Sequence, residues 1–141
     1  LCDRRQRQMC IRDSLLPDLM DIYEHKQIRL ERLKGDAPFV IHCNASLAHI
    51  LVTNLVKNAL LHNLDGGRLV VQTTPVSLVV KNSGTAPLDE AMLFKRFAHS
   101  VDRKKESTGL GLAISEAIAS SCSLHLSYQW EDGMHVFSLV K

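Results

Sequence analysis

The sequence predicts an α/β two-layer sandwich, in which a mixed, largely antiparallel sheet carries helices on one face. Two strand-like segments, 68–74 and 77–81, follow each other closely, and a second such pair occupies 124–130 and 134–140. Apolar residues at helical spacing precede the first pair and separate it from the second. Strand pairs that alternate with amphipathic helices can bury one face of a sheet beneath the helices. The chain is long enough for one such domain.

Residues 1–13 are interpreted separately from the domain. The stretch RRQRQMCIRD at 4–13 is residue for residue the translation of a common transposon-end sequencing adapter. We therefore expect residues 1–13 to be a disordered cloning or assembly remnant, and the domain to span 14–141. The alternative is a basic arm that binds nucleic acid or a membrane surface. Domain sequence joined directly to a remnant leads us to expect an N-terminally truncated protein.

The elements before the first strand pair follow from local patterns. Apolar residues at helical spacing predict a short helix within 15–23. The segment 28–33 alternates with period two, and 39–43 is a second strand candidate. Asn44 or Ser46 then caps the central helix.

The central helix has a face that is apolar at first and becomes polar near the helix end. The stretch NLDGG at 63–67 stops this helix. The segments 68–74 and 77–81 then form an antiparallel pair. The residues on the face are separated by three and four positions: Leu47, Leu51, Asn54 or Leu55, Asn58 and His62.

The second half of the domain begins with the helix 110–121. The segments 124–130 and 134–140 form a hairpin around the dipeptide DG at 132–133, a strong turn signal. Before the helix, the polar and charged stretch 99–108 shows no periodicity and is expected to be a loop.

Charge and cysteine content narrow the function classes. The chain has 17 Lys and Arg and 15 Asp and Glu, and equal numbers remain without the four arginines and two aspartates of residues 1–13. A net charge near zero gives no reason to expect nucleic acid or anionic lipid as a partner. Cys2 and Cys10 belong to the remnant, whereas Cys43 and Cys122 show neither metal-ligand spacing nor a disulfide framework, which fits a reducing cytosol. No apolar run has the length of a membrane span.

Four short motifs occur in a fixed order along the chain: NLVKNA at 54–59, NSG at 82–84, LFKRF at 93–97 and STGLGLAI at 107–114. Together they resemble the N, G1, F and G2 boxes of the ATP-binding catalytic domain of sensor histidine kinases, a branch of the Bergerat-fold (GHKL) ATPases. The resemblance extends from about residue 15 to residue 141. It implies the Bergerat ATP-binding fold, ATP and Mg²⁺ as cofactors, and transfer of the γ-phosphoryl group to a histidine.

The N box supplies the first site residues. The resemblance makes Asn58 the magnesium ligand, and an amide oxygen suits this ion; a hydrogen-bonded core asparagine is the alternative. Asn54 stands where gyrase-like and chaperone-like relatives keep a glutamate that activates water, and an amide cannot accept that proton. His62 either packs against adenine or is an exposed capping residue. Leu61 replaces a lysine that contacts phosphate in many relatives.

The G1 box departs from the Asp-x-Gly-x-Gly pattern of the family. Asn82 takes the place of the aspartate that accepts a hydrogen bond from the adenine amine, and its carbonyl oxygen can still accept one. Gly84 permits close approach of the backbone to the base. Ala86 replaces the second glycine. By itself an Asn-Ser-Gly loop is also an ordinary turn.

The F and G2 boxes complete the predicted site. The resemblance makes Arg96 a candidate for contacting the terminal phosphate and stabilising the transferred charge, the alternative being a solvated arginine between two core phenylalanines. Backbone amides at the start of the helix 110–121 can face phosphate. Ser107 replaces the first glycine of the G2 box. The nucleotide-binding positions expected here are Phe97, Thr108, Gly109, Leu110, Gly111 and Leu112.

We therefore expect the catalytic domain of a two-component sensor histidine kinase. None of the seven histidines lies in the acceptor pattern of the family. The implied partners are upstream dimerisation and phosphoacceptor helices and a response regulator, in a membrane-anchored homodimer with this domain on the cytoplasmic side. The alternatives are an anti-sigma-type serine kinase, a topoisomerase-type ATPase, which Asn54 disfavours, and a degenerate module that binds nucleotide or a partner without catalysis. The departures that keep the degenerate module open are Leu61, Asn82, Ala86 and Ser107.

Overall fold

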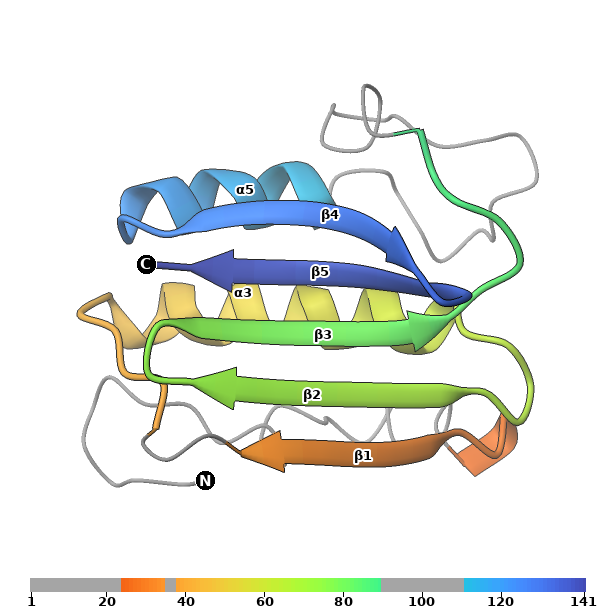
Figure 1. Ribbon diagram of the computed structural model, residues 1–141. Coiled ribbons are helices and arrows are strands. Elements are labelled where there is room, and N and C mark those ends of the chain that lie inside the picture. Colours follow the sequence, from red (N-terminus) through yellow and green to blue (C-terminus); the bar gives the residue numbers. More distant parts are fainter. Residues whose placement is uncertain (1–23, 35–37, 90–110) are drawn as a thin grey trace.

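The computed structural model describes residues 24–34, 38–89 and 111–141 (Figure 1). Residues 1–13, interpreted above as a remnant, the helix predicted within 15–23 and the F box at 93–97 lie outside the described residues. The regular elements in the described part are the strands β1 (Arg29–Lys34), β2 (Arg68–Thr74), β3 (Ser77–Ser83), β4 (His125–Glu131) and β5 (Met134–Val140) and the helices α3 (Ala45–Leu61) and α5 (Gly111–Ser121).

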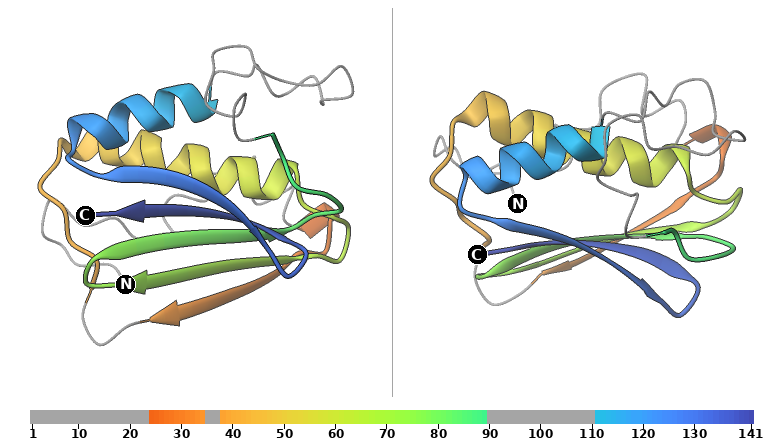
Figure 2. Two further views of the ribbon diagram at one scale, coloured as in Figure 1. Left: turned by 45° about the horizontal axis from the view of Figure 1, so that its top comes forward. Right: turned by 90° about the horizontal axis from the view of Figure 1, so that it is seen from above.

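The strands form one mixed sheet in the order β1-β2-β3-β5-β4. β1 and β2 are parallel because α3 forms the crossover between them, and the other neighbouring pairs are antiparallel. Both helices cover the same face of this sheet (Figure 2). The predicted fold class, a two-layer sandwich with a largely antiparallel sheet, is confirmed.

The ends of α3 show how local sequence sets the helix. The Asn44 side-chain oxygen accepts hydrogen bonds from the backbone N–H groups of Ser46 and Leu47, at 2.8 and 3.3 Å. This satisfies two donors that the first helical turn leaves without partners and confirms Asn44 as the cap. At the other end, the His62 N–H donates to the Asn58 carbonyl oxygen at 3.1 Å.

Four predictions about strands and turns had different outcomes. β1 begins one residue later than predicted, and β3 extends to Ser83. The hairpin turn is confirmed, since Asp132 and Gly133 both have positive φ, at 51° and 76°, as a type I′ turn requires. The predicted strand at 39–43 is wrong, because these residues form no strand. Phe39 and Ile41 are partly buried against the core, so the apolar run reflects packing without strand pairing.

The core lies between the helices and the sheet. Residues that face each other across this layer are almost fully buried. Burial of these side chains fixes α3 and α5 on the sheet. As a result, the C-terminal end of α3, the N-terminal end of α5 and the end of β3 all point toward the same edge (Figure 1). The largest fully buried apolar side chains are Leu51, Leu55, Leu60, Leu69, Phe137 and Leu139.

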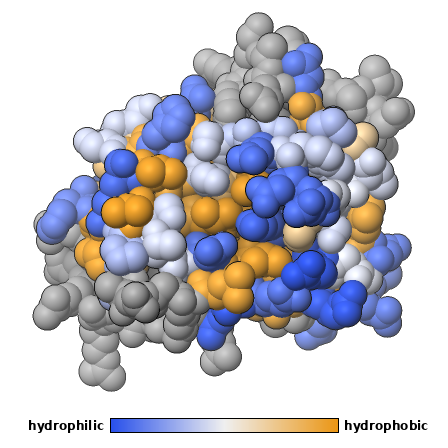
Figure 3. All heavy atoms as spheres, viewed as in Figure 1, coloured by the Kyte–Doolittle hydropathy of each residue, from blue (hydrophilic) through white to orange (hydrophobic). Residues whose placement is uncertain are grey.

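The other face of the sheet has no helical cover among the described residues and mixes hydrophilic and hydrophobic side chains (Figure 3). On this face the Arg68 guanidinium makes two hydrogen bonds to the Glu31 carboxylate, at 3.0 and 2.7 Å. The pair links β1 to β2, and because both side chains are exposed to solvent it contributes little to stability. In the described part of the chain, no helix combines the length and apolar character needed to cross a membrane.

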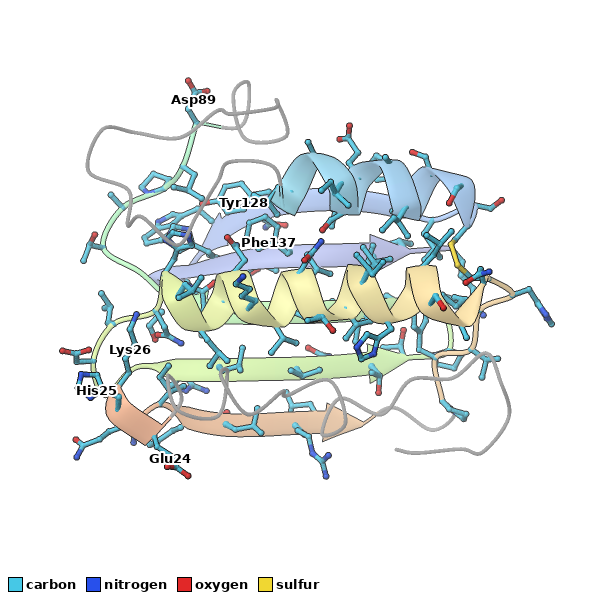
Figure 4. All side chains as sticks on the ribbon, turned by 180° about the vertical axis from the view of Figure 1, so that it is seen from behind. Glu24, His25, Lys26, Asp89, Tyr128 and Phe137 are labelled. Carbon is cyan, nitrogen blue, oxygen red and sulfur yellow. A yellow bond between two sulfur atoms is a disulfide. The ribbon has the colours of Figure 1, made fainter. Side chains whose placement is uncertain are left out.

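Cys43 and Cys122 form a disulfide, although the sequence showed no disulfide framework (Figure 4). Their Cα atoms are 5.4 Å apart, and 79 positions separate them in the sequence. Cys43 directly precedes the cap of α3 and Cys122 directly follows α5. The two helices run in opposite directions, which brings these ends together. In a reducing compartment the same pair is expected to exist as thiols.

Candidate functional site

The predicted site residues that the structure describes gather at the edge where α3 and β3 end. Asn54, Asn58 and Leu61 lie on α3, and His62 is its C-terminal cap. Asn82 lies on β3, Gly84 and Ala86 follow it, and Gly111 and Leu112 open α5. The predicted site residues that lie outside the described residues are Arg96, Phe97, Ser107, Thr108, Gly109 and Leu110.

The last turns of α3 present amide groups. Asn54 and Asn58 lie one turn apart and are both partly exposed. The backbone carbonyl of Asn58 is used within the helix, and its carboxamide oxygen is a hard donor of the kind that Mg²⁺ accepts. Leu61 is 8% exposed, so apolar burial accounts for this residue where relatives carry a lysine.

A buried lysine caps the end of α3, and sequence reasoning missed it. The Lys26 ammonium donates hydrogen bonds to the carbonyl oxygens of Leu60, Leu61 and Asn63, at 3.1, 2.7 and 3.2 Å. The Leu60 carbonyl also accepts a hydrogen bond from the Asn63 N–H at 3.3 Å, and a positive charge at the C-terminal end of a helix is favourable. Figure 4 shows Lys26 beside this end of the helix, ahead of β1. No local signal identifies it, because its partners lie more than 30 positions away.

The connection from α3 to β2 is also tightly bonded. The Asn63 side chain donates to the Arg68 carbonyl oxygen at 3.0 Å and accepts from the Leu64 N–H at 2.8 Å. A Cβ at Gly67 would overlap the Asn63 side-chain oxygen, so glycine is needed at this point. The end of α3 that carries Asn58 is therefore held from two sides.

Asn82 lies on the helix-facing side of the sheet and is 1% exposed. It is paired with Leu69 of β2 on one side and His135 of β5 on the other. Its side-chain nitrogen donates to the Ser83 carbonyl oxygen at 3.2 Å. This bond orients the carboxamide, so that the oxygen is the group left to accept a hydrogen bond from a ligand.

Gly84 has a reason to be glycine that the sequence did not reveal. A Cβ at this position would overlap the imidazole ring of His135. The Gly84 N–H donates to the carbonyl oxygen of Gly133 at 3.0 Å, which fixes the backbone against the β4–β5 turn. The sequence predicted that the adenine base approaches Gly84 closely. On the side where a Cβ would point, the His135 ring makes this close approach instead.

His135 belongs to an aromatic cluster on β4 and β5. Its Nδ1 lies 2.8 Å from the Tyr128 hydroxyl, and the Leu88 N–H donates to the same hydroxyl at 3.0 Å. The Trp130 ring meets the imidazole edge-on, with the ring centroids 4.9 Å apart. Burial lowers the pKa of His135 below its ordinary value. Period-two alternation places Tyr128 and Trp130 on one face of β4, but the hydrogen bond between Tyr128 and Leu88 has no local signal.

α5 begins at Gly111, so its first backbone amides lie at the same edge as the end of α3. Leu112 is buried in the core, and only its backbone is therefore placed for a contact with phosphate.

The chain matches known proteins in both sequence and structure. The profile of the family described as histidine kinase-, DNA gyrase B- and HSP90-like ATPase matches residues 43–139. The chain is 34% identical to the sensor histidine protein kinase HK06 of Streptococcus pneumoniae over 134 residues, which cover 86% of this chain and 30% of the relative. It is 31% identical over 112 residues to the drug sensory protein A of Synechocystis sp., covering 66% and 17% respectively.

Among solved structures, the mycobacterial sensor histidine kinase MprB superposes with a TM-score of 0.73 at 23% identity, covering 92% of this chain and 89% of that one. The catalytic domain of histidine kinase ThkA superposes with a TM-score of 0.71 at 20% identity, covering 92% and 88%. These likenesses establish the fold.

The chain therefore belongs to the family of histidine kinase-, DNA gyrase B- and HSP90-like ATPases. Within it, the chain is an ATP-binding catalytic domain of the histidine kinase type, as the order of the four boxes predicted. It spans 30% of the length of its pneumococcal relative.

Proposed function

We propose that this domain binds ATP with Mg²⁺ where α3 and β3 end, and passes the γ-phosphoryl group to a histidine on dimerisation helices outside this chain. The observation that carries the proposal is the placement of Asn54 and Asn58 on the last turns of α3, at the edge where β3 ends, one residue after Asn82. Membership in the family supports the same conclusion.

Asn58 is the proposed magnesium ligand. Mg²⁺ takes few protein ligands and completes its octahedral shell with water and substrate phosphates, so one partly exposed amide oxygen fits it. The bound ion supplies charge neutralisation at the phosphates. The Asn82 side-chain oxygen accepts a hydrogen bond from the adenine amine, and the first backbone N–H groups of α5 face the phosphates.

Asn54 favours phosphoryl transfer over hydrolysis. It occupies the helical turn before Asn58, where a general base for water would need a carboxylate. Its amide can orient a group but cannot take up a proton at neutral pH. Arg96, outside the described residues, is proposed to stabilise the transferred charge.

The proposed partners are the upstream dimerisation and phosphoacceptor helices and a response regulator, in a membrane-anchored homodimer with the domain on the cytoplasmic side. These proposed partners are supported by the name of the pneumococcal relative, a sensor histidine protein kinase. One observation favours a second candidate, a nucleotide-binding module without catalysis. Leu61 is buried where relatives present a lysine to phosphate.

The test is calorimetric titration of ADP with Mg²⁺ and with EDTA for the parent and Asn58→Ala. Because the lost interaction runs through the metal, the variant should lose affinity about tenfold with Mg²⁺ and little in EDTA. Gln129→Ala is the matched control, since it removes an exposed amide on β4. Equal losses with Mg²⁺ and EDTA would make Asn58 a structural residue.

A further inference from the structure

The segment after β3 is tied to the sheet at two points. At its start, the Gly84 N–H donates to the Gly133 carbonyl oxygen at 3.0 Å. At its end, the Leu88 N–H donates to the Tyr128 hydroxyl oxygen at 3.0 Å. Ala86 lies between these two bonds, and Asn82 immediately precedes the segment. The path of residues 84–88 therefore depends on where the Tyr128 hydroxyl is held.

His135 fixes that hydroxyl. The Tyr128 oxygen accepts the Leu88 N–H, so we assign its own proton to the hydrogen bond with His135 Nδ1, 2.8 Å away. Nδ1 can accept this proton only when the imidazole is neutral and carries its hydrogen on Nε2. The ring is 7% exposed, and burial lowers its pKa, which favours the neutral form.

The same imidazole also lies beneath Gly84, in the space that a Cβ would take, and beside Asn82 in the strand register. One ring thus contacts the start of the segment and, through Tyr128, holds its end.

We propose that Tyr128 and His135 are positioning residues that set the path of residues 84–88 along the adenine side of the nucleotide site. The proposal rests on the function proposed above. Neutral His135 holds the Tyr128 hydroxyl, which holds Leu88. Protonation of His135 places a hydrogen on Nδ1, removes the acceptor for Tyr128 and loosens the segment.

The other titratable groups around His135 do not share this role. Across the sheet its neighbours are Asn82, which does not titrate, and Trp130. Lys81 and Glu131 alternate with these residues and project from the opposite face. Tyr128 ordinarily titrates only near pH 10.

Three further titratable groups lie near this edge. Asp89 is exposed and follows Leu88 directly, whereas Lys26 and His62 lie at the end of α3. His62 is a second histidine near the proposed nucleotide site, so the test must separate the effect of His135 from that of His62.

The first experiment removes the hydroxyl with Tyr128→Phe. Amide hydrogen exchange at Leu88, measured without nucleotide, should accelerate several-fold because its acceptor is gone. ADP affinity should fall about threefold to tenfold, the range expected for one hydrogen bond. Unchanged Leu88 exchange and unchanged ADP affinity would overturn the proposal. A parent protein that binds no ADP would refute the proposed function, while Leu88 exchange would still report on the tether.

The second experiment uses pH. In His135→Asn the side-chain oxygen replaces Nδ1 at the same distance along the side chain and does not titrate. At pH 7.5 this variant should bind ADP within about threefold of the parent, and between pH 7.5 and 5.0 the parent should lose affinity relative to it. Titration of His62 is common to both proteins and cancels in the ratio. His125→Asn, exposed on β4, is the control and should follow the parent. A parent whose pH profile matches that of His135→Asn would overturn the role of His135.

Discussion

The carboxamide of Asn82 is held by its own strand, and this limits what a carboxylate could do in its place. The side-chain nitrogen donates to the Ser83 carbonyl oxygen at 3.2 Å, and the side chain is 1% exposed. In Asn82→Asp an oxygen would replace that nitrogen and face another acceptor. The position that looks like a simple departure from the family pattern is therefore matched to its surroundings.

We expect Asn82→Asp to lower the free energy of unfolding by about 1–3 kcal/mol, the cost of a buried acceptor without a donor. In the proposed role the amide already presents its oxygen to the base, so the preference for ADP over GDP should rise by less than about tenfold. Urea denaturation and competition binding of the two nucleotides measure the two effects. A variant that is as stable as the parent and far more selective would contradict this account.

His135 makes stability depend on pH in a defined direction. Burial lowers its pKa in the folded state below the ordinary 6.5, so the unfolded chain binds the proton more readily. Its contribution is fully present above about pH 6.5 and is lost as the pH falls toward the lowered folded-state pKa. Urea denaturation at pH 7.5 and 5.0 should therefore show a larger loss for the parent than for His135→Asn. Equal losses of stability in the two proteins would mean that a group other than His135 causes the pH dependence.

At the scale of elements, α3 shows which features a local pattern can predict. The cap was predicted to be Asn44 or Ser46, and it is Asn44, because the residue type and the apolar spacing behind it are neighbours in sequence. The Asp132-Gly133 turn was predictable for the same reason. The cap at the other end was not, because Lys26 reaches it from before β1.

Removing the Lys26 ammonium should weaken the end of α3 that carries Asn58 and His62. Lys26→Met keeps much of the buried apolar stem but leaves the carbonyls of Leu60, Leu61 and Asn63 without this donor. We expect a loss of about 1–3 kcal/mol in the free energy of unfolding and faster amide exchange in the last turn of α3. Lys57→Met, exposed on the same helix, is the control. Similar effects of both substitutions would mean that general charge removal, and not the cap, is responsible.

For the whole molecule, the sequence predicted the layers and the strand pairs, since period-two and helical spacing are local properties. It could not predict the Cys43–Cys122 contact or the Tyr128–Leu88 bond, which exist only once α3, α5 and the sheet have packed. The strand predicted at 39–43 was wrong because a short apolar run can pack against the core without pairing with a strand. The described N-box and G1-box residues lie at one edge of the fold, while their contacts with nucleotide stay predictions.

The proposed separation between the nucleotide site and the acceptor histidine leads to a prediction about the isolated chain. None of its seven histidines lies in the acceptor pattern of the family, and position 54 carries an amide where hydrolysis would need a carboxylate. Phosphoryl transfer depends on a positioned nucleophile, so ATP bound to this chain alone has no group to attack its γ-phosphorus efficiently. Incubation with γ-labelled ATP should leave the chain unlabelled and release phosphate only slowly, whereas the same domain joined to the proposed phosphoacceptor helices should acquire acid-labile label on those helices. Acid-labile label on a histidine of this chain would contradict the proposed separation between the nucleotide site and the acceptor.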